Sequence, residues 1–183
     1  MQRTLLGQTD LNVSRLGFGA APIGFLETPA KQTGKLVDLL LDRGVNLFDT
    51  AAMYMGAEAR LGQALKGHRD DVVLVSKAGH AEDELPGEAW SPKLLRASVE
   101  RSLDRLQTDH LDIVMLHSCG LDVLDKGEAL ATLIELRGEG KLRYAGYSGD
   151  NDAAAHAAAL DGIDIIETSV SIADQHNIDV VLP

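Results

Sequence analysis

The sequence predicts an α/β fold built from repeated strand–helix units, and two observations carry that prediction. Short apolar runs alternate with longer amphipathic stretches along the 183 residues. The runs are almost continuously apolar, which is typical of strands buried on both faces of a parallel sheet. A repeat of this kind forms either an open doubly wound sheet or a closed (β/α)8 barrel.

Six apolar runs are expected to be strands, and they cover residues 14–20, 45–49, 71–77, 111–117, 142–148 and 163–169. Helical patterns fill four of the gaps, over residues 29–44, 91–106, 127–141 and 152–162. The second of these opens with Ser91 as a candidate N-cap and Pro92 at the first helical position. Ahead of the first strand, "RTLLGQTDLNVS" (3–14) predicts a β-hairpin.

The open sheet and the closed barrel differ in how they bind phosphates. An open dinucleotide-binding sheet carries a glycine-rich turn after its first strand, but "GFGAAPIG" (17–24) lacks the third glycine at the required spacing. A Walker A sequence is also absent, because Lys35 and Lys141 are each followed by Leu. The pattern therefore favours the barrel, as a single domain over residues 1–183.

Composition and charge exclude several classes of function. The chain has 17 Lys and Arg against 28 Asp and Glu, a net charge of −11, which argues against unspecific binding to nucleic acid or to an anionic membrane. A single cysteine, Cys119, excludes an internal disulfide and makes a reducing, cytoplasmic location the default. The first residues lack a signal-peptide run, and no segment approaches a membrane span.

Potentially reactive side chains stand where the expected strands end. Asp49, Lys77, His117 and Ser148 each close an apolar run, and Tyr54 follows the second strand in "NLFDTAAMY" (46–54). Taken singly, each has a structural explanation, such as a helix N-cap for Asp49 or a packed residue for Tyr54. Strand ends of a barrel converge on one mouth, however, so the joint placement predicts a catalytic site. We expect His68 and His80, in loops or at helix ends, to be solvated.

The chemistry open to this set is general acid–base catalysis on a carbonyl group. A buried Lys77 ammonium beside the Tyr54 phenol is expected to lower the tyrosine pKa from its usual value of about 10. Asp49 would keep Lys77 charged, and His117 could hydrogen-bond a substrate oxygen. No side chain supplies a hydride, so carbonyl reduction would require a nicotinamide cofactor.

The combination of "FDTAAMYMGAEARLGQAL", "LVSKAG" and "DIVMLHS" resembles the aldo-keto reductase family, and more closely its bacterial-type members. The resemblance extends over essentially the whole chain. It implies a catalytic tetrad of Asp49, Tyr54, Lys77 and His117 that uses NADPH, or alternatively NADH. The substrate would be a small carbonyl compound or a sugar, with no metal, nucleic acid or membrane partner.

The resemblance also implies a cofactor site, formed by Gly19, Ala20, Asp49, Ser148 and Glu167. Two positions depart from the family pattern, since Gly149 stands where the family often has Asn, and Glu167 where it commonly has Gln. A carboxylate at 167 can accept a hydrogen bond from a carboxamide nitrogen but cannot donate one to its oxygen.

A barrel of this type needs typically ~250 residues, so the sequence predicts about six βα units with the last two missing. The short length has three explanations: a fragment of a longer enzyme, a natural short form that completes its barrel with another chain, or a defective product. Self-association would cover the open strand edges. The alternative to an enzyme is a non-catalytic binding or regulatory subunit on the same scaffold. A metal hydrolase is disfavoured, because the histidines lack ligand spacing.

Overall fold

The computed structural model describes residues 1–182 and begins with the predicted hairpin. Strand β1 (Arg3–Leu5) pairs antiparallel with β2 (Asn12–Ser14). Thr9 holds the connecting turn, because its hydroxyl donates to the Leu6 carbonyl oxygen at 2.6 Å and accepts from the Leu11 amide at 3.2 Å. The hairpin prediction is therefore confirmed.

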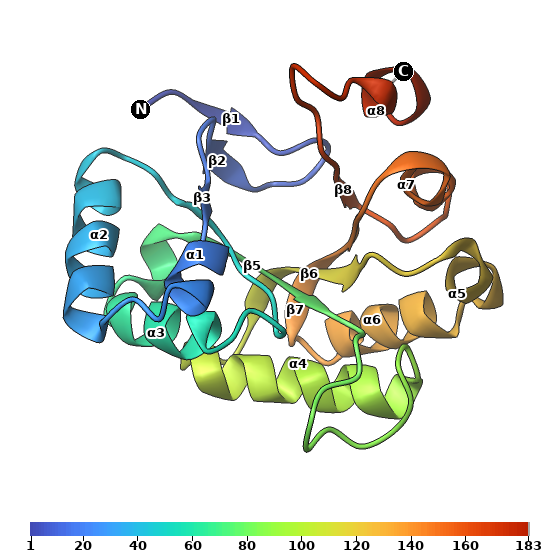
Figure 1. Ribbon diagram of the computed structural model, residues 1–183, viewed down its shortest axis with the longest axis horizontal. Helices are drawn as coiled ribbons and strands as arrows, with labels where there is room; N and C mark the ends of the chain where they lie inside the picture. The colour runs from blue at the N-terminus through green and yellow to red at the C-terminus, as the bar shows by residue number, and fades with distance from the viewer. Residues whose placement is uncertain (183) are drawn as a thin grey trace.

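Six parallel strands follow and form one curled sheet (Figure 1). They are β3 (Phe18–Gly19), β4 (Leu47–Asp49), β5 (Val73–Ala78), β6 (Leu111–His117), β7 (Leu142–Ser148) and β8 (Ile165–Glu167). Each strand pairs with the next one along the chain, which is the order of a barrel wall and not of a doubly wound sheet. The predicted fold, an incomplete (β/α)8 barrel of six units with an N-terminal hairpin, is confirmed.

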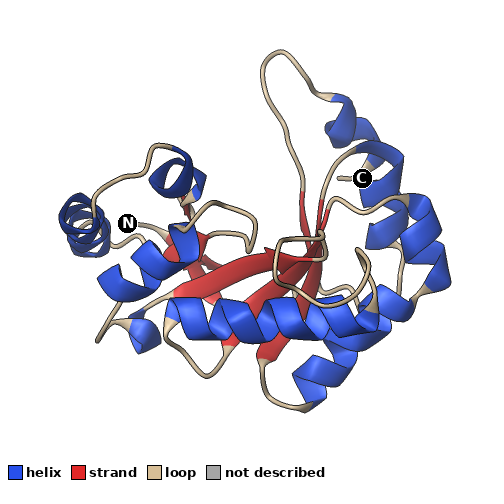
Figure 2. Cartoon of the chain, turned by 60° about the horizontal axis from the view of Figure 1, so that its bottom comes forward, coloured by secondary structure: helices blue, strands red, loops and turns tan. Residues whose placement is uncertain are grey.

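The helices run around the outside of the sheet (Figure 2). They are α1 (Ala21–Phe25), α2 (Ala30–Asp42), α3 (Ala57–Ala64), α4 (Pro92–Leu106), α5 (Leu121–Lys126), α6 (Glu128–Gly138), α7 (Asn151–Ala158) and α8 (His176–Val180), with a 3-10 turn, η1, at Arg69–Asp71. Across residues 1–182, none of the helices combines the length and apolar character that crossing a membrane requires.

Side chains of the central strands point alternately to the two faces of the sheet, and both faces are buried. Residues such as Leu74 and Val114 face outward and pack with the helices in the main core. Their neighbours in the strands face inward and form a second cluster with Leu11 and Val13 of the hairpin; they are Val73, Val75, Ile113 and Met115. The hairpin thus covers the inner face near the amino ends of the strands.

Several elements differ from those expected, and two of the differences have a clear physical reason. The run 14–20 forms a strand only at Phe18–Gly19, because Ser14 belongs to the hairpin and its hydroxyl bonds the Leu16 carbonyl oxygen at 2.7 Å, which turns the chain. Helix α3 was not predicted as a helix. Its sequence AEARLGQA contains a single large apolar residue, Leu61, and therefore shows no apolar stripe.

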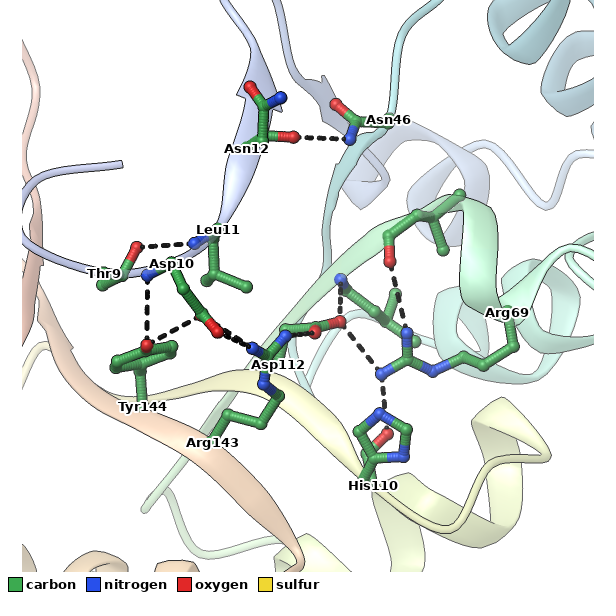
Figure 3. A network of polar contacts seen from close by, with 12 residues as sticks. Thr9, Asp10, Leu11, Asn12, Asn46, Arg69, His110, Asp112, Arg143 and Tyr144 are labelled. Atoms are coloured by element: carbon green, nitrogen blue, oxygen red, sulfur yellow. Dashed lines mark hydrogen bonds and ion pairs between the residues drawn. The ribbon is translucent and has the colours of Figure 1, made fainter. Parts of the chain in front are cut away.

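A polar cluster ties the hairpin to the amino ends of the strands (Figure 3). We call Asp10, Arg69, Asp112, Arg143 and Tyr144 the hairpin latch. The Asp112 carboxylate is almost fully buried and binds Arg69 at 2.9 Å, Arg143 at 3.0 Å and the Leu74 amide at 2.9 Å. Arg143 also donates to both carboxylate oxygens of Asp10, at 2.7 and 2.8 Å, and the Tyr144 hydroxyl donates to Asp10 at 2.8 Å.

Candidate active site

Polar side chains gather at the carboxyl ends of the strands, opposite the hairpin latch. Asp49, His117, Ser148 and Glu167 each end a strand, and Lys77 is the penultimate residue of β5. Strand register brings neighbours level, because His117 pairs with Ser148 and Ser148 pairs with Glu167. The curl of the sheet then turns these strand ends toward one mouth.

The Lys77 side chain is fully buried at the centre of this mouth. Its ammonium donates hydrogen bonds to the Asp49 carboxylate and, at 3.2 Å, to the Thr50 carbonyl oxygen. A second carboxylate, Glu167, lies 3.3 Å away from the Lys77 nitrogen. A buried ammonium is costly without such partners, so these contacts keep Lys77 charged.

Burial shapes the ionisation of this pair. It raises the pKa of Asp49 to about 6, because attraction by Lys77 offsets only part of the desolvation and the Glu167 carboxylate adds repulsion. Burial alone would lower the pKa of Lys77, but the Asp49 and Glu167 carboxylates outweigh it, and the Lys77 pKa lies above its ordinary value. At neutral pH the two groups therefore form an ion pair.

Tyr54 stands in the loop after β4, against three neighbours. Its ring centre lies 5.5 Å from the Lys77 nitrogen, 5.8 Å from the His117 ring centre and 5.7 Å from that of Phe25. Gly24 permits this packing, because a Cβ there would lie only 2.6 Å from the Tyr54 carbonyl oxygen. The structure thus brings Asp49, Tyr54, Lys77 and His117 together.

The expected direction of the Tyr54 pKa shift was wrong. Burial of the phenol raises the pKa of Tyr54 above its ordinary value, and Lys77 lowers it by less. The carboxylates of Asp49 and Glu167 add to the rise, because they repel a phenolate. The expectation considered only the attraction between Lys77 and a Tyr54 phenolate, and it left out the burial of the phenol and the two carboxylates.

His117 lies in an aromatic row. Its ring centre is 5.2 Å from that of His80, which in turn is 5.0 Å from the Trp90 ring. His80 is therefore packed against the site, and the expectation that it is solvated was wrong. Burial, and then the Lys77 charge and interaction with the neighbouring His80, lower the pKa of His117 to about 4, so its imidazole is neutral at pH 7.

The chain is similar to the proteins of one known family. A model of the Aldo/keto reductase family matches residues 15–179. The chain belongs to the aldo/keto reductase family.

Three relatives illustrate the similarity of this aldo/keto reductase chain to known proteins. The L-galactose dehydrogenase of Arabidopsis thaliana is 35% identical over an alignment of 153 positions, which covers 79% of this chain and 47% of the relative. The NADH-specific methylglyoxal reductase of Escherichia coli is 34% identical over an alignment of 208 positions, gaps included, which covers 100% of this chain and 63% of the relative. The solved structure of a Pseudomonas aeruginosa protein assigned to the aldo-keto reductases superposes with a TM-score of 0.87 at 36% identity, and covers 97% of this chain and 72% of that chain. This chain thus spans about half the length of the first relative and under two thirds of the second.

The residues expected to bind a nicotinamide cofactor in this aldo/keto reductase chain occupy two separate places, at the end of β3 and at the ends of β7 and β8. Gly19 leaves open space where a side chain would begin, and the buried Ala20 donates its amide to the Asp49 carbonyl oxygen at 2.7 Å. Ser148 and Glu167 line a cavity of about 210 Å³, together with Ser118, Gly149, Asp150, Thr168 and Ser169. Hydroxyl and carboxylate groups of this kind suit a carboxamide.

The departure from the family pattern at Gly149 has a steric cause. A Cβ at this position would lie 2.6 Å from the Tyr147 hydroxyl oxygen. That hydroxyl is fixed by a 2.8 Å hydrogen bond to the Cys119 carbonyl oxygen, and the Tyr147 side chain is fully buried. An asparagine therefore cannot be accommodated at 149 without moving Tyr147.

One residue beneath the site, Glu58, could not be singled out from the sequence. Its carboxylate is 1% exposed, accepts a hydrogen bond from the Ser76 hydroxyl at 2.7 Å and lies 3.5 Å from Arg105. Arg105 also donates to the Ala52 carbonyl oxygen at 3.1 Å, which supports the loop that carries Tyr54. A glutamate in a polar helix usually lies at the surface, so only tertiary structure reveals this contact.

Within residues 1–182, no group of three or more His, Cys, Asp or Glu side chains is arranged to hold a metal ion.

Proposed function

We propose that the chain carries the reacting groups of an oxidoreductase that reduces aldehydes or ketones, or oxidises a sugar hydroxyl, with Tyr54 as general acid and base. One observation carries the proposal: the Tyr54 phenol lies between the Lys77 ammonium, 5.5 Å from its ring centre, and the His117 ring. The names of two relatives, an L-galactose dehydrogenase and a methylglyoxal reductase, support these substrate classes.

Each group then has a separate task. The Tyr54 hydroxyl donates its proton to the substrate carbonyl oxygen during reduction, and the phenolate takes the proton back during oxidation. Lys77 stabilises the phenolate by its positive charge, and Asp49 holds the ammonium in place. His117, neutral at working pH, hydrogen-bonds the substrate oxygen and orients it toward Tyr54.

A bound nicotinamide cofactor supplies the hydride that no side chain can provide. Ser148 and Glu167 would hold its carboxamide, and Gly19 and Ala20, at the end of β3, would contact the cofactor from the opposite edge of the sheet. We take NADPH as the first candidate donor and NADH as the second, since one relative is named as NADH-specific.

Replacing Tyr54 by Phe tests the proposal. The substitution removes the proton donor and leaves the ring, so reduction of methylglyoxal should fall by about 10²–10⁴-fold. Binding of NADPH, followed by its fluorescence, should stay near that of the parent chain. Tyr144→Phe is the matched control, because that hydroxyl binds Asp10 at the opposite end of the sheet. A Tyr54→Phe variant that retains most of its turnover with both NADPH and NADH would contradict the proposal.

A further inference from the structure

The Lys77 ammonium has more acceptors around it than the proposed mechanism uses. An ammonium has three N–H donors. Two of them are engaged by the Asp49 carboxylate and the Thr50 carbonyl oxygen. The Glu167 carboxylate lies 3.3 Å from the same nitrogen, and the Tyr54 ring centre lies 5.5 Å from it.

Glu167 reaches Lys77 across the mouth. Strands β5 and β8 are separated in the sheet by β6 and β7, so their side chains meet only because the sheet curls. The Ser148 hydroxyl donates to the same Glu167 oxygen, Oε1, at 3.2 Å and fixes the carboxylate in this direction. The Glu167 side chain is 43% exposed, whereas that of Lys77 is fully buried, so the carboxylate covers Lys77 from the solvent side.

We infer that Glu167 is a positioning residue, which competes with Tyr54 for the positive charge of Lys77 and thereby sets how readily the phenol gives up its proton. The inference rests on the proposed role of Tyr54. It differs from a cofactor contact, because it concerns the pairing of Glu167 with Lys77 in the chain alone.

The charges around the phenol give the competition its direction. The titratable groups that face Tyr54 and Lys77 are Asp49 from β4, His117 from β6, His80 from the loop after β5, and Glu167 from β8. His117 is neutral above about pH 4, which leaves Lys77 and the two carboxylates as the charges closest to the phenol. A carboxylate that binds Lys77 and repels a phenolate keeps Tyr54 protonated to higher pH.

Glu167→Gln tests the inference in the chain without any ligand. Glutamine has nearly the same shape and can still accept from Ser148, but it lacks the charge. Tyrosinate absorbance is titrated in the parent chain and in Glu167→Gln, and each curve is subtracted from that of the same protein carrying Tyr54→Phe. The difference isolates Tyr54 from the other two tyrosines. Ionisation of Tyr54 should move to lower pH in Glu167→Gln.

Two further variants complete the experiment. Glu84→Gln removes the same charge from the loop after β5, where Glu84 shares a cavity with His80, and it should leave the Tyr54 titration unchanged. Glu167→Ala removes the carboxylate altogether and should shift Tyr54 in the same direction as Glu167→Gln, which covers a failure of either variant to fold.

The outcomes separate this inference from the proposed function. A Tyr54 titration that is identical in the parent chain and in both Glu167 variants, or that shifts equally in Glu84→Gln, overturns the role of Glu167. Turnover that survives Tyr54→Phe overturns the proposed function. The effect of Glu167 on the Tyr54 phenol would then have no part in catalysis. A shift confined to the Glu167 variants, with turnover lost in Tyr54→Phe, supports both.

Discussion

His117 ends β6 with its ring between those of Tyr54 and His80. Because burial, the Lys77 charge and the neighbouring His80 lower its pKa to about 4, we expect the ring to stay neutral throughout the physiological range. A proton NMR titration should show the His117 ring resonance, assigned with a His117→Gln variant, moving only near pH 4. A midpoint at the ordinary value for histidine would show that the ring is solvated.

The same shift affects folding stability. Between about pH 4 and the ordinary histidine value of 6.5, the unfolded chain binds more protons at His117 than the folded chain does, so its contribution to stability falls on acidification through that window. Asp49 has the opposite sign, because its folded pKa of about 6 exceeds its ordinary value of 3.8. Its contribution is present below 3.8 and is lost as the pH rises through about 6. Urea unfolding of His117→Gln should therefore show less loss of stability between pH 6.5 and 4 than the parent chain shows.

That Asp49, Tyr54, Lys77 and His117 lie together could be predicted from the sequence, because three of them stand at expected strand ends and Tyr54 in the loop after one. The sequence could not show the environment that sets their protonation. The Tyr54 pKa depends on burial and on Glu167, a residue of the last strand, and neither follows from local pattern. His80 was misjudged for the same reason, since its packing on Trp90 depends on the course of a loop.

Among the elements, the hairpin latch is built on one buried carboxylate, which reaches the hairpin through Arg143 and Asp10. Asp112 joins Arg69, Arg143 and the Leu74 amide. Asp112→Asn leaves two guanidinium groups without their shared negative charge, so it should lower the free energy of unfolding, measured in urea, by about 2–3 kcal/mol. The loss stays within this range because both arginines are partly exposed to solvent.

Asp10→Asn is the comparison for that prediction. Asp10 accepts both N–H bonds of the same Arg143 group, but its side chain is 69% exposed, so solvent screens the pair. The expected loss is below about 1 kcal/mol. Equal losses in the two variants would mean that burial of Asp112 contributes nothing to the latch.

Strands and helices with a clear apolar pattern were predicted accurately, and those without one were not. Strands β5, β6 and β7 were predicted within a residue or two, because their runs are buried on both faces. Helix α3 was missed, because small residues let it pack closely without an apolar stripe. A Cβ at Gly62 would lie 2.6 Å from the Arg105 carbonyl oxygen of α4, a proximity that only the packed structure reveals.

At the scale of the whole molecule, two strands keep open edges. Within residues 1–182, β3 and β8 each have a neighbour on one side only. Open edges favour pairing with another chain, whereas the net charge of −11 opposes it. We expect association of the chain to increase with ionic strength, because at 0.1 M salt charges more than about 10 Å apart are largely screened.

Sedimentation velocity at low and moderate salt, over a range of protein concentrations, measures this effect. An apparent mass that rises with both variables supports edge pairing. A single species of constant mass under all conditions would show that the edges are protected within the chain itself.

The contact between Lys77 and Glu167 joins two halves of the chain that are synthesised far apart, and it forms only when the sheet has curled. Long-range contacts of this kind are made late, because the intervening chain must first lose its conformational freedom. During refolding, Tyr54 should therefore acquire its final ionisation behaviour only after the helices have formed. Its tyrosinate absorbance in a stopped-flow experiment would then time the arrival of the last strand.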